Sequence, residues 1–131
     1  MRSIEVRTKK HEEIVDITRE IAAIAAASEC REGLCTVFVP HTTAGVTINE
    51  NADPDVKADI LMALRNAVPD SLPYAHGEGN SPAHVKAGLA GSSVSVIVVE
   101  GRLQLGTWQG ICLCEFDGPR TRKVWVSISG R

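Results

Sequence analysis

The chain has 131 residues, a length that fits one domain, and 44% of them are hydrophobic, as in ordinary globular proteins. Its net charge is −2, and both signs of charge are scattered without the basic patch typical of nucleic-acid binding. No apolar run approaches the ~20 residues that span a bilayer, and residues 1–6 contain no apolar signal core. We therefore expect a single cytoplasmic domain over residues 1–131, with neither nucleic acid nor a membrane as partner.

The first half of the chain predicts strands around one helix. Ile17, Ile21 and Ile24 lie at helical spacing and predict a helix over residues 16–28, with Asp16 or Thr18 as its cap. Alternating or β-forming residues predict strands at residues 3–8, at a short stretch that ends near residue 14, at 34–39 and at 46–50. We expect the last two of these strands to be antiparallel neighbours.

Two proline signals mark helix starts in the second half. Asp53-Pro54 places a capping carboxylate before a first-turn proline, and Ser81-Pro82 repeats the pattern. The predicted helices run over residues 54–68 and 82–89, with Gly91 as the stop of the second. Strands are predicted at residues 93–99, 102–105, 111–116 and 123–129, the last two as a hairpin around Asp117-Gly118-Pro119-Arg120.

Strands outnumber helices in this prediction, and the helices fall in the first two thirds of the chain. The pattern indicates an α+β fold with a mainly antiparallel sheet. The four cysteines form no Cys-x-x-Cys pair, and cytosolic thiols stay reduced. We interpret them as buried small hydrophobic residues rather than zinc ligands or disulfides.

Three of the four histidines lie in connecting segments rich in glycine and proline. His41 follows a strand that ends at Pro40, and His76 and His84 bracket a polar stretch. Neutral histidine is the commonest protein metal ligand, and His84 falls in the first turn of a predicted helix, where the helix dipole disfavours the imidazolium. The alternatives are a His41 bonded to the Thr42 or Thr43 hydroxyl and exposed rings at the other two positions. His11, in a charged stretch, is read as a surface residue.

Several polar residues near these histidines are candidates for acid–base work or for orienting a substrate. Glu50 and Glu78 are flanked by small or amide residues that leave room for a ligand. Asp53 is better explained as a helix cap. Asn49 and Asn80 could orient a substrate or form turns with their own backbone.

The segment Gly106-Thr107-Trp108-Gln109-Gly110 adds an aromatic face and an amide between glycines. Trp108 and Gln109 could therefore contact a substrate, although Trp108 could equally be a core anchor. Arg120 and Arg122 flank the last turn and could hold a phosphate, or be simply solvated.

These strings together resemble the YjbQ-like family, which also carries the label secondary thiamine-phosphate synthase. The resemblance rests on the run from His41 to Asn51 (HTTAGVTINEN), on Asp53-Pro54, on Glu78-Gly79-Asn80 with His84, on Gly101-Arg102-Leu103 and on the Gly106–Gly110 string. It covers the chain from about residue 4 to residue 128. The stretch from His76 to His84 is shorter here than in many relatives.

The resemblance implies an α+β fold with an antiparallel sheet curved into a half-barrel and about three helices packed against it. It also implies a homotrimer and a metal pocket that maps onto His41, His76 and His84, with zinc as the first candidate ion and magnesium as the alternative. The synthase label implies the joining of a pyrimidine pyrophosphate to a thiazole phosphate with loss of pyrophosphate. In this reading Glu50 or Glu78 is the catalytic acid–base group, and the substrate is held by Asn49, Asn80, Trp108 and Gln109.

Two other readings stay open from the residues themselves. A three-histidine zinc site could serve a hydrolase. The chain could also be a module that binds a small molecule or a metal without turnover, with the trimeric assembly that the resemblance implies. The absence of a glycine-rich diphosphate cradle counts against the synthase reaction.

Overall fold

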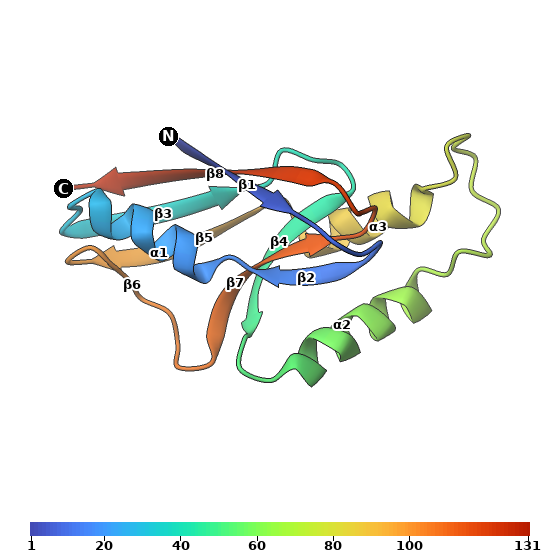
Figure 1. Cartoon of the computed structure of the whole chain (residues 1–131), viewed down its shortest axis with the longest axis horizontal. Coiled ribbons are helices and arrows are strands. Elements are labelled where there is room, and N and C mark those ends of the chain that lie inside the picture. The colour runs from blue at the N-terminus through green and yellow to red at the C-terminus, as the bar shows by residue number, and fades with distance from the viewer.

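The computed structural model describes all 131 residues, which form eight strands and three helices (Figure 1). Every strand pairing is antiparallel, so the predicted α+β class with an antiparallel sheet is confirmed. The elements are β1 (Arg2–Arg7), β2 (Glu13–Asp16), α1 (Thr18–Ala27), β3 (Glu32–Phe38), β4 (Ala44–Glu50), α2 (Pro54–Ala67), α3 (Ser81–Ala90), β5 (Ser93–Val99), β6 (Arg102–Leu103), β7 (Gln109–Glu115) and β8 (Thr121–Gly130).

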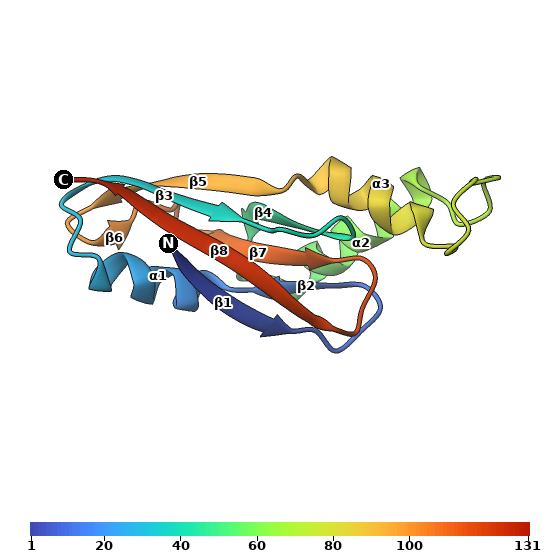
Figure 2. The same ribbon diagram turned by 90° about the horizontal axis from the view of Figure 1, so that it is seen from above.

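The strands form two sheets that lie one behind the other. The larger sheet has the order β1-β8-β3-β5-β6 and curls into a half-barrel, and the smaller has the order β2-β7-β4 (Figure 2). Helix α1 contacts β6, β7 and β8, and α3 contacts β4 and β7. Helices α2 and α3 lie at the opposite end of the molecule from α1, on either side of the segment 68–80 (Figure 1).

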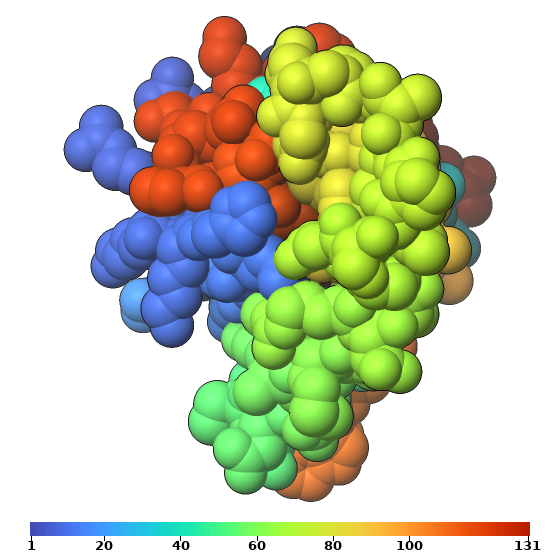
Figure 3. Space-filling model, turned by 90° about the vertical axis from the view of Figure 1, so that its right-hand side faces the viewer, coloured from blue at the N-terminus to red at the C-terminus, as the bar shows by residue number.

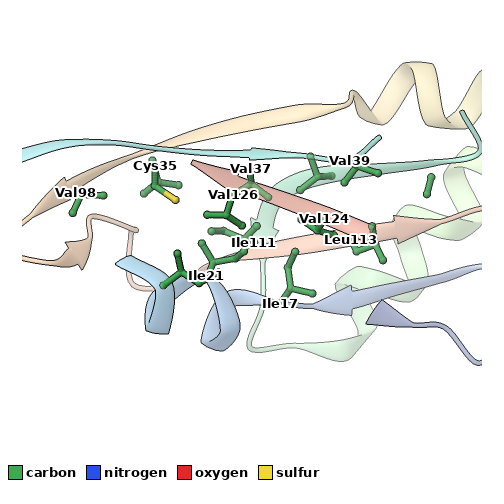
Figure 4. Close-up of a cluster of buried hydrophobic side chains, with 14 of the residues drawn as sticks. Ile17, Ile21, Cys35, Val37, Val39, Val98, Ile111, Leu113, Val124 and Val126 are labelled. Atoms are coloured by element: carbon green, nitrogen blue, oxygen red, sulfur yellow. The ribbon is translucent and has the colours of Figure 1, made fainter. Parts of the chain in front are cut away.

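The main core fills the space between the two sheets and α1 (Figure 4). Alternate residues of β3, β5 and β8 point into it, including Val37, Val98 and Val126. Strand β7 is buried on both faces, because Leu113 belongs to this core while Cys114 packs in a second cluster under α3. All four cysteines are buried and free, as the sequence predicted.

Two predicted strand pairings are wrong. Residues 46–50 do not pair with residues 34–39, because β4 pairs with β7 while β3 lies between β5 and β8. Residues 111–116 and 123–129 form no hairpin, because β7 lies between β2 and β4 and β8 lies between β1 and β3. Since a strand has only two edges, these neighbours leave no edge for the predicted partners. At both connections the chain instead crosses from one sheet to the other.

The three helices start within two residues of their predicted positions, but only α2 has the predicted cap. Asp53 caps α2 by accepting a hydrogen bond from Asp55 N. The N-cap of α1 is Ile17, although the Asp16 carboxylate accepts from Thr18 N. The N-cap of α3 is Asn80 rather than Ser81, without a side-chain cap bond. None of the three helices combines the length and the apolar character needed to cross a membrane.

Helix α3 can approach β4 closely because position 45 is glycine. A Cβ atom added at Gly45 would lie 2.6 Å from Gly91 O and 3.1 Å from Ala90 Cβ. Glycine at this position therefore sets the distance between α3, which carries His84, and the smaller sheet.

We expect Gly45→Ala to destabilise the fold by about 1–3 kcal/mol, because the added methyl group overpacks against backbone. Gly88→Ala is the matched control. It lies in α3 with nothing within 4 Å of an added Cβ and should stabilise the chain by about 0.5–1 kcal/mol. Chemical denaturation of both variants measures the two effects, and equal stabilities would contradict a close α3–β4 contact.

Candidate functional site

A polar cavity of about 480 Å³ opens where three connections meet at the α3 end of the molecule. The connections are the β3–β4 crossing, the segment before α3 and the β7–β8 crossing; in Figure 3 the last two lie side by side. None of the lining residues is hydrophobic. They are Thr42, Thr43, His76, Glu78, Asn80, His84, Asp117 and Arg120. A lining of this kind suits a small, strongly polar or charged ligand.

The structure brings together four of the residues predicted from the sequence. The rings of His76 and His84 lie edge to face, with their centroids 5.5 Å apart. The Glu78 carboxylate lies 3.9 Å from His76 Nε2, and Asn80 lines the same cavity. Two imidazoles and a carboxylate thus share one solvent-open space.

His41 does not line the cavity, although the adjacent Thr42 does. Its Nε2 accepts a hydrogen bond of 2.9 Å from Lys123 N, instead of bonding to a neighbouring threonine. Burial lowers the pKa of His41 below its usual value, and the positive charge of Arg122 lowers it further. A neutral imidazole has one unprotonated nitrogen, which Lys123 already occupies. No three histidine, cysteine or acidic side chains are arranged as a metal site in the structure.

Asp117 links two other residues of the cavity wall. Its Oδ2 accepts hydrogen bonds from Asn80 Nδ2 at 2.9 Å and from Arg120 Nη2 at 3.3 Å. The amide oxygen of Asn80, Oδ1, is buried and accepts no hydrogen bond. The Arg120 side chain is half exposed, so it can turn further donors toward a ligand.

A buried ion pair lies against this wall. Glu115 accepts hydrogen bonds from Arg122 Nε at 2.9 Å and from the Thr8 hydroxyl at 2.8 Å, and both charged side chains are almost completely buried. Arg122 Nη2 also donates to the Thr43 hydroxyl at 2.8 Å. Arg122 is therefore not the exposed phosphate-binding group that its place beside a turn suggested. Burial alone would raise the pKa of Glu115, but the hydrogen bonds from Arg122 and Thr8 bring it below its usual value.

The other predicted residues lie at the far end of the β4–β7 ladder. Glu50 pairs with Gln109 there, whereas Ala44 pairs with Glu115 at the cavity end. Six residues of strand separate the two ends, roughly 20 Å. Within one chain, the far group therefore cannot contact a ligand that the cavity encloses.

The side chains of this far group bond mainly to nearby backbone. Asn49 accepts from Glu50 N, Glu50 accepts from Ala52 N, and Gln109 accepts from Gly106 N. Trp108 is 65% exposed, so its alternative interpretation as a core anchor is wrong.

Sequence reasoning missed Thr42, Thr43 and Asp117 as cavity residues. The threonines directly follow His41, so their place beside a candidate metal ligand was the signal that could have predicted them. Asp117 lay in a segment interpreted as a hairpin turn, a reading that gave it no role in a cavity. Only the crossing of the chain between the sheets brings Asp117 and Arg120 to Asn80.

The sequence matches the family described as "UPF0047 protein YjbQ-like" over residues 2–131. The chain belongs to the YjbQ-like family. It is 49% identical to a UPF0047 protein of Methanocaldococcus jannaschii, over 96% of this chain and 91% of that one. It is 47% identical to the UPF0047 protein YugU of Bacillus subtilis, over 99% of each.

The YjbQ-like fold is also found in crystal structures of similar proteins. A YjbQ/UPF0047 protein of Clostridium acetobutylicum superposes with a TM-score of 0.96 at 50% identity, over 98% of this chain and all of that one. A protein of Sulfolobus solfataricus superposes with a TM-score of 0.95 at 36% identity, over 99% of this chain and 96% of that one.

The buried ion pair predicts a specific acid dependence of stability. Because folding lowers the pKa of Glu115, its ionisation stabilises the fold fully above the ordinary value of 4.5, and this stabilisation is lost as pH falls through the lower folded pKa. Glu115→Gln should destabilise the chain by about 3–5 kcal/mol at pH 7, because it leaves Arg122 buried and unpaired. As the pH falls below 4.5, the free energy of unfolding should also decrease less in this variant than in the wild type.

Denaturant unfolding of the wild type and of Glu115→Gln, from pH 7 to pH 3, measures the free energy of unfolding at each pH. Glu5→Gln, at an exposed position of β1, is the control and should follow the wild type. A Glu115→Gln variant with wild-type stability at pH 7 would show that the pair contributes nothing.

Proposed function

We propose that this chain is a metal-dependent enzyme that acts on a small phosphorylated substrate in the cavity beside α3. The observation that carries the proposal is the pairing of His76 and His84, 5.5 Å apart, in a space without an apolar lining. Apolar side chains line most ligand pockets, so a lining made only of polar groups favours a charged ligand and its counter-ion. Arg120 and the Thr42 hydroxyl supply donors for the anionic group of such a ligand.

The chemistry of the donors, although not their arrangement in this structure, suits a divalent transition metal. Two imidazole nitrogens and one carboxylate form a ligand set used in catalytic zinc sites, which keep a position open for substrate. His76 and His84 would supply the nitrogens, and the exposed Glu78, whose carboxylate lies 3.9 Å from His76 Nε2, would be the third donor. His41, the third ligand in the prediction from sequence, would first have to give up its bond to Lys123. In this proposal Glu78 holds the ion, which replaces its predicted acid–base role.

The first reaction to test is the joining of a pyrimidine pyrophosphate to a thiazole phosphate, with release of pyrophosphate. A divalent ion would supply charge neutralisation for that leaving group. Arg120 and Thr42 would bind a phosphate, and Asn80 would hold Asp117 so that Arg120 keeps its direction. Hydrolysis of a phosphorylated compound is the second reaction, because the same residues bind the same group.

We expect the untagged wild-type chain to bind about one zinc or other transition-metal ion, and His84→Ala and Glu78→Ala to lose it. His41→Ala should keep the metal, because its ring lies outside the group. His11→Ala, at an exposed position, is the control for a general effect of removing histidine. Elemental analysis after dialysis measures the stoichiometry.

Loss of metal in His41→Ala with retention in Glu78→Ala would show instead that His41 is the third ligand. No metal in the wild type would contradict the proposed centre. Pyrophosphate release in a metal-loaded sample tests the reaction itself. Binding of the substrates without any product would favour the alternative of a binding module.

We also propose that the chain works as a homotrimer in the cytoplasm. The free, buried cysteines suit a reducing compartment. Self-association is supported by the convex face of the larger sheet, which no helix covers and which exposes several large apolar side chains. These are Leu34, Phe38, Ile97, Val99 and Trp125. Phe38 and Trp125 stack there with ring centroids 5.8 Å apart.

Sedimentation velocity should give about three times the chain mass of 14.0 kDa. Ile97→Lys, in the middle of the exposed face, should dissociate the assembly while leaving the circular dichroism spectrum unchanged. Ser71→Lys, on the exposed segment before α3, is the matched control. A monomeric wild type would contradict the trimer, and a trimeric Ile97→Lys would show that this face is not the interface.

A further inference from the structure

The segment 68–80, which carries His76 and Glu78, has little packing of its own beyond the buried Val68 at its start. It joins α2, which contains no fully buried residue, to α3, and most of its residues are exposed. A second cavity of about 180 Å³ is lined both by residues of the segment, among them Asp70 and Glu78, and by residues of the body, among them His11 and Phe116. The position of this segment must therefore depend on how its two flanking helices are held.

A single carboxylate of the body accepts hydrogen bonds from both of these helices. Glu12, immediately before β2, accepts a hydrogen bond of 2.6 Å from Lys86 Nζ of α3 through one oxygen. Its other oxygen accepts one of 3.1 Å from Arg65 Nη1, in the last turn of α2. Glu12 thus bridges the end of α2 and the middle of α3, across the ends of segment 68–80.

The two halves of this bridge differ in burial. The Lys86 side chain is 4% exposed and that of Glu12 is 10% exposed, whereas that of Arg65 is 52% exposed. Removal of one partner from a buried ion pair leaves an unpaired charge and is costly, but an exposed pair contributes little. The Lys86 contact is therefore the stronger half. Apolar contacts of Leu61 and Leu64 with the cluster under α3 complete the hold on α2.

We propose that Glu12 is a positioning residue for the candidate site. By bridging Lys86 and Arg65 it fixes the end of α2 relative to α3, and so holds His76 and Glu78 opposite His84. Glu12 does not line the cavity and touches no ligand there. The metal readout below rests on the proposed function, whereas the exchange readout does not.

The test compares Glu12→Gln with the wild type in two measurements. Titration with Co²⁺ should show about tenfold weaker binding in the variant with unchanged stoichiometry, because the ligands remain but are less well placed. Within residues 69–80 the hydrogen-bonded amides, those of Tyr74 and Gly79, should exchange faster than in the wild type, while exchange in β3 and β8 stays the same. Arg65→Met should show the same changes to a smaller extent.

Two controls separate positioning from loss of stability. Val98→Ala, in the core remote from the segment, lowers global stability without touching the bridge. Glu13→Gln alters the neighbouring carboxylate, which accepts only from Lys9 N. Both should keep wild-type Co²⁺ affinity and wild-type exchange in residues 69–80. Co²⁺ affinity that falls as much in Val98→Ala as in Glu12→Gln would overturn the proposal.

The outcomes also separate this inference from the proposed function. If the wild type binds no Co²⁺, the metal centre is wrong, and faster exchange of residues 69–80 in Glu12→Gln alone still supports the bridge. If the wild type binds Co²⁺ and Glu12→Gln changes neither affinity nor exchange, the bridge does not position the segment and the inference is wrong.

Discussion

The buried pair of Glu115 and Arg122 is the interaction on which the cavity end of this fold depends. Two charges removed from water must satisfy each other and their remaining hydrogen-bonding groups, or the fold is strongly destabilised. Here Thr8, directly after β1, donates a hydrogen bond to Glu115, and Thr43, directly before β4, accepts one from Arg122. The pair therefore holds together the ends of strands from both sheets. Two residues of the cavity wall are bonded to this pair. Arg122 donates to the Thr43 hydroxyl, and Asp117 N donates to the Glu115 carboxylate.

Local sequence signals predicted the elements well, and the pairing of β5 with β6 across a tight turn, but two pairings were wrong. Asp53-Pro54 marks the start of α2 because a capping carboxylate and a first-turn proline act within a few residues. The alternation in residues 93–99 likewise predicts β5. Pairing depends instead on which strand edges are free, a property of the whole sheet. An Asp-Gly turn signal at 117–118 therefore suggested a hairpin, although both strands beside it already have two neighbours.

The same distinction explains which part of the candidate site was predictable. His76, Glu78, Asn80 and His84 lie within nine residues of one another, so a local motif was enough to group them, and they share the cavity. Glu50 and Trp108 belong to equally recognisable strings, but the β4–β7 register carries them to the opposite end of the ladder. Asp117 and Arg120 join the site only through the crossing between the sheets. Sequence spacing could not give either result, because both depend on contacts between distant parts of the chain.

The charges of the cavity bear on the order in which ligands can bind. With the two imidazoles uncharged, the lining carries one cation, Arg120, and two anions, Glu78 and Asp117, for a net charge of −1. An anionic substrate alone would meet a negative surface, and Arg120 is already shared with Asp117. A divalent cation between His76 and His84 would reverse the net charge to +1 and leave Arg120 to act with it. Because coupling between two ligands is reciprocal, a phosphorylated substrate would then tighten the hold on the metal by the same factor.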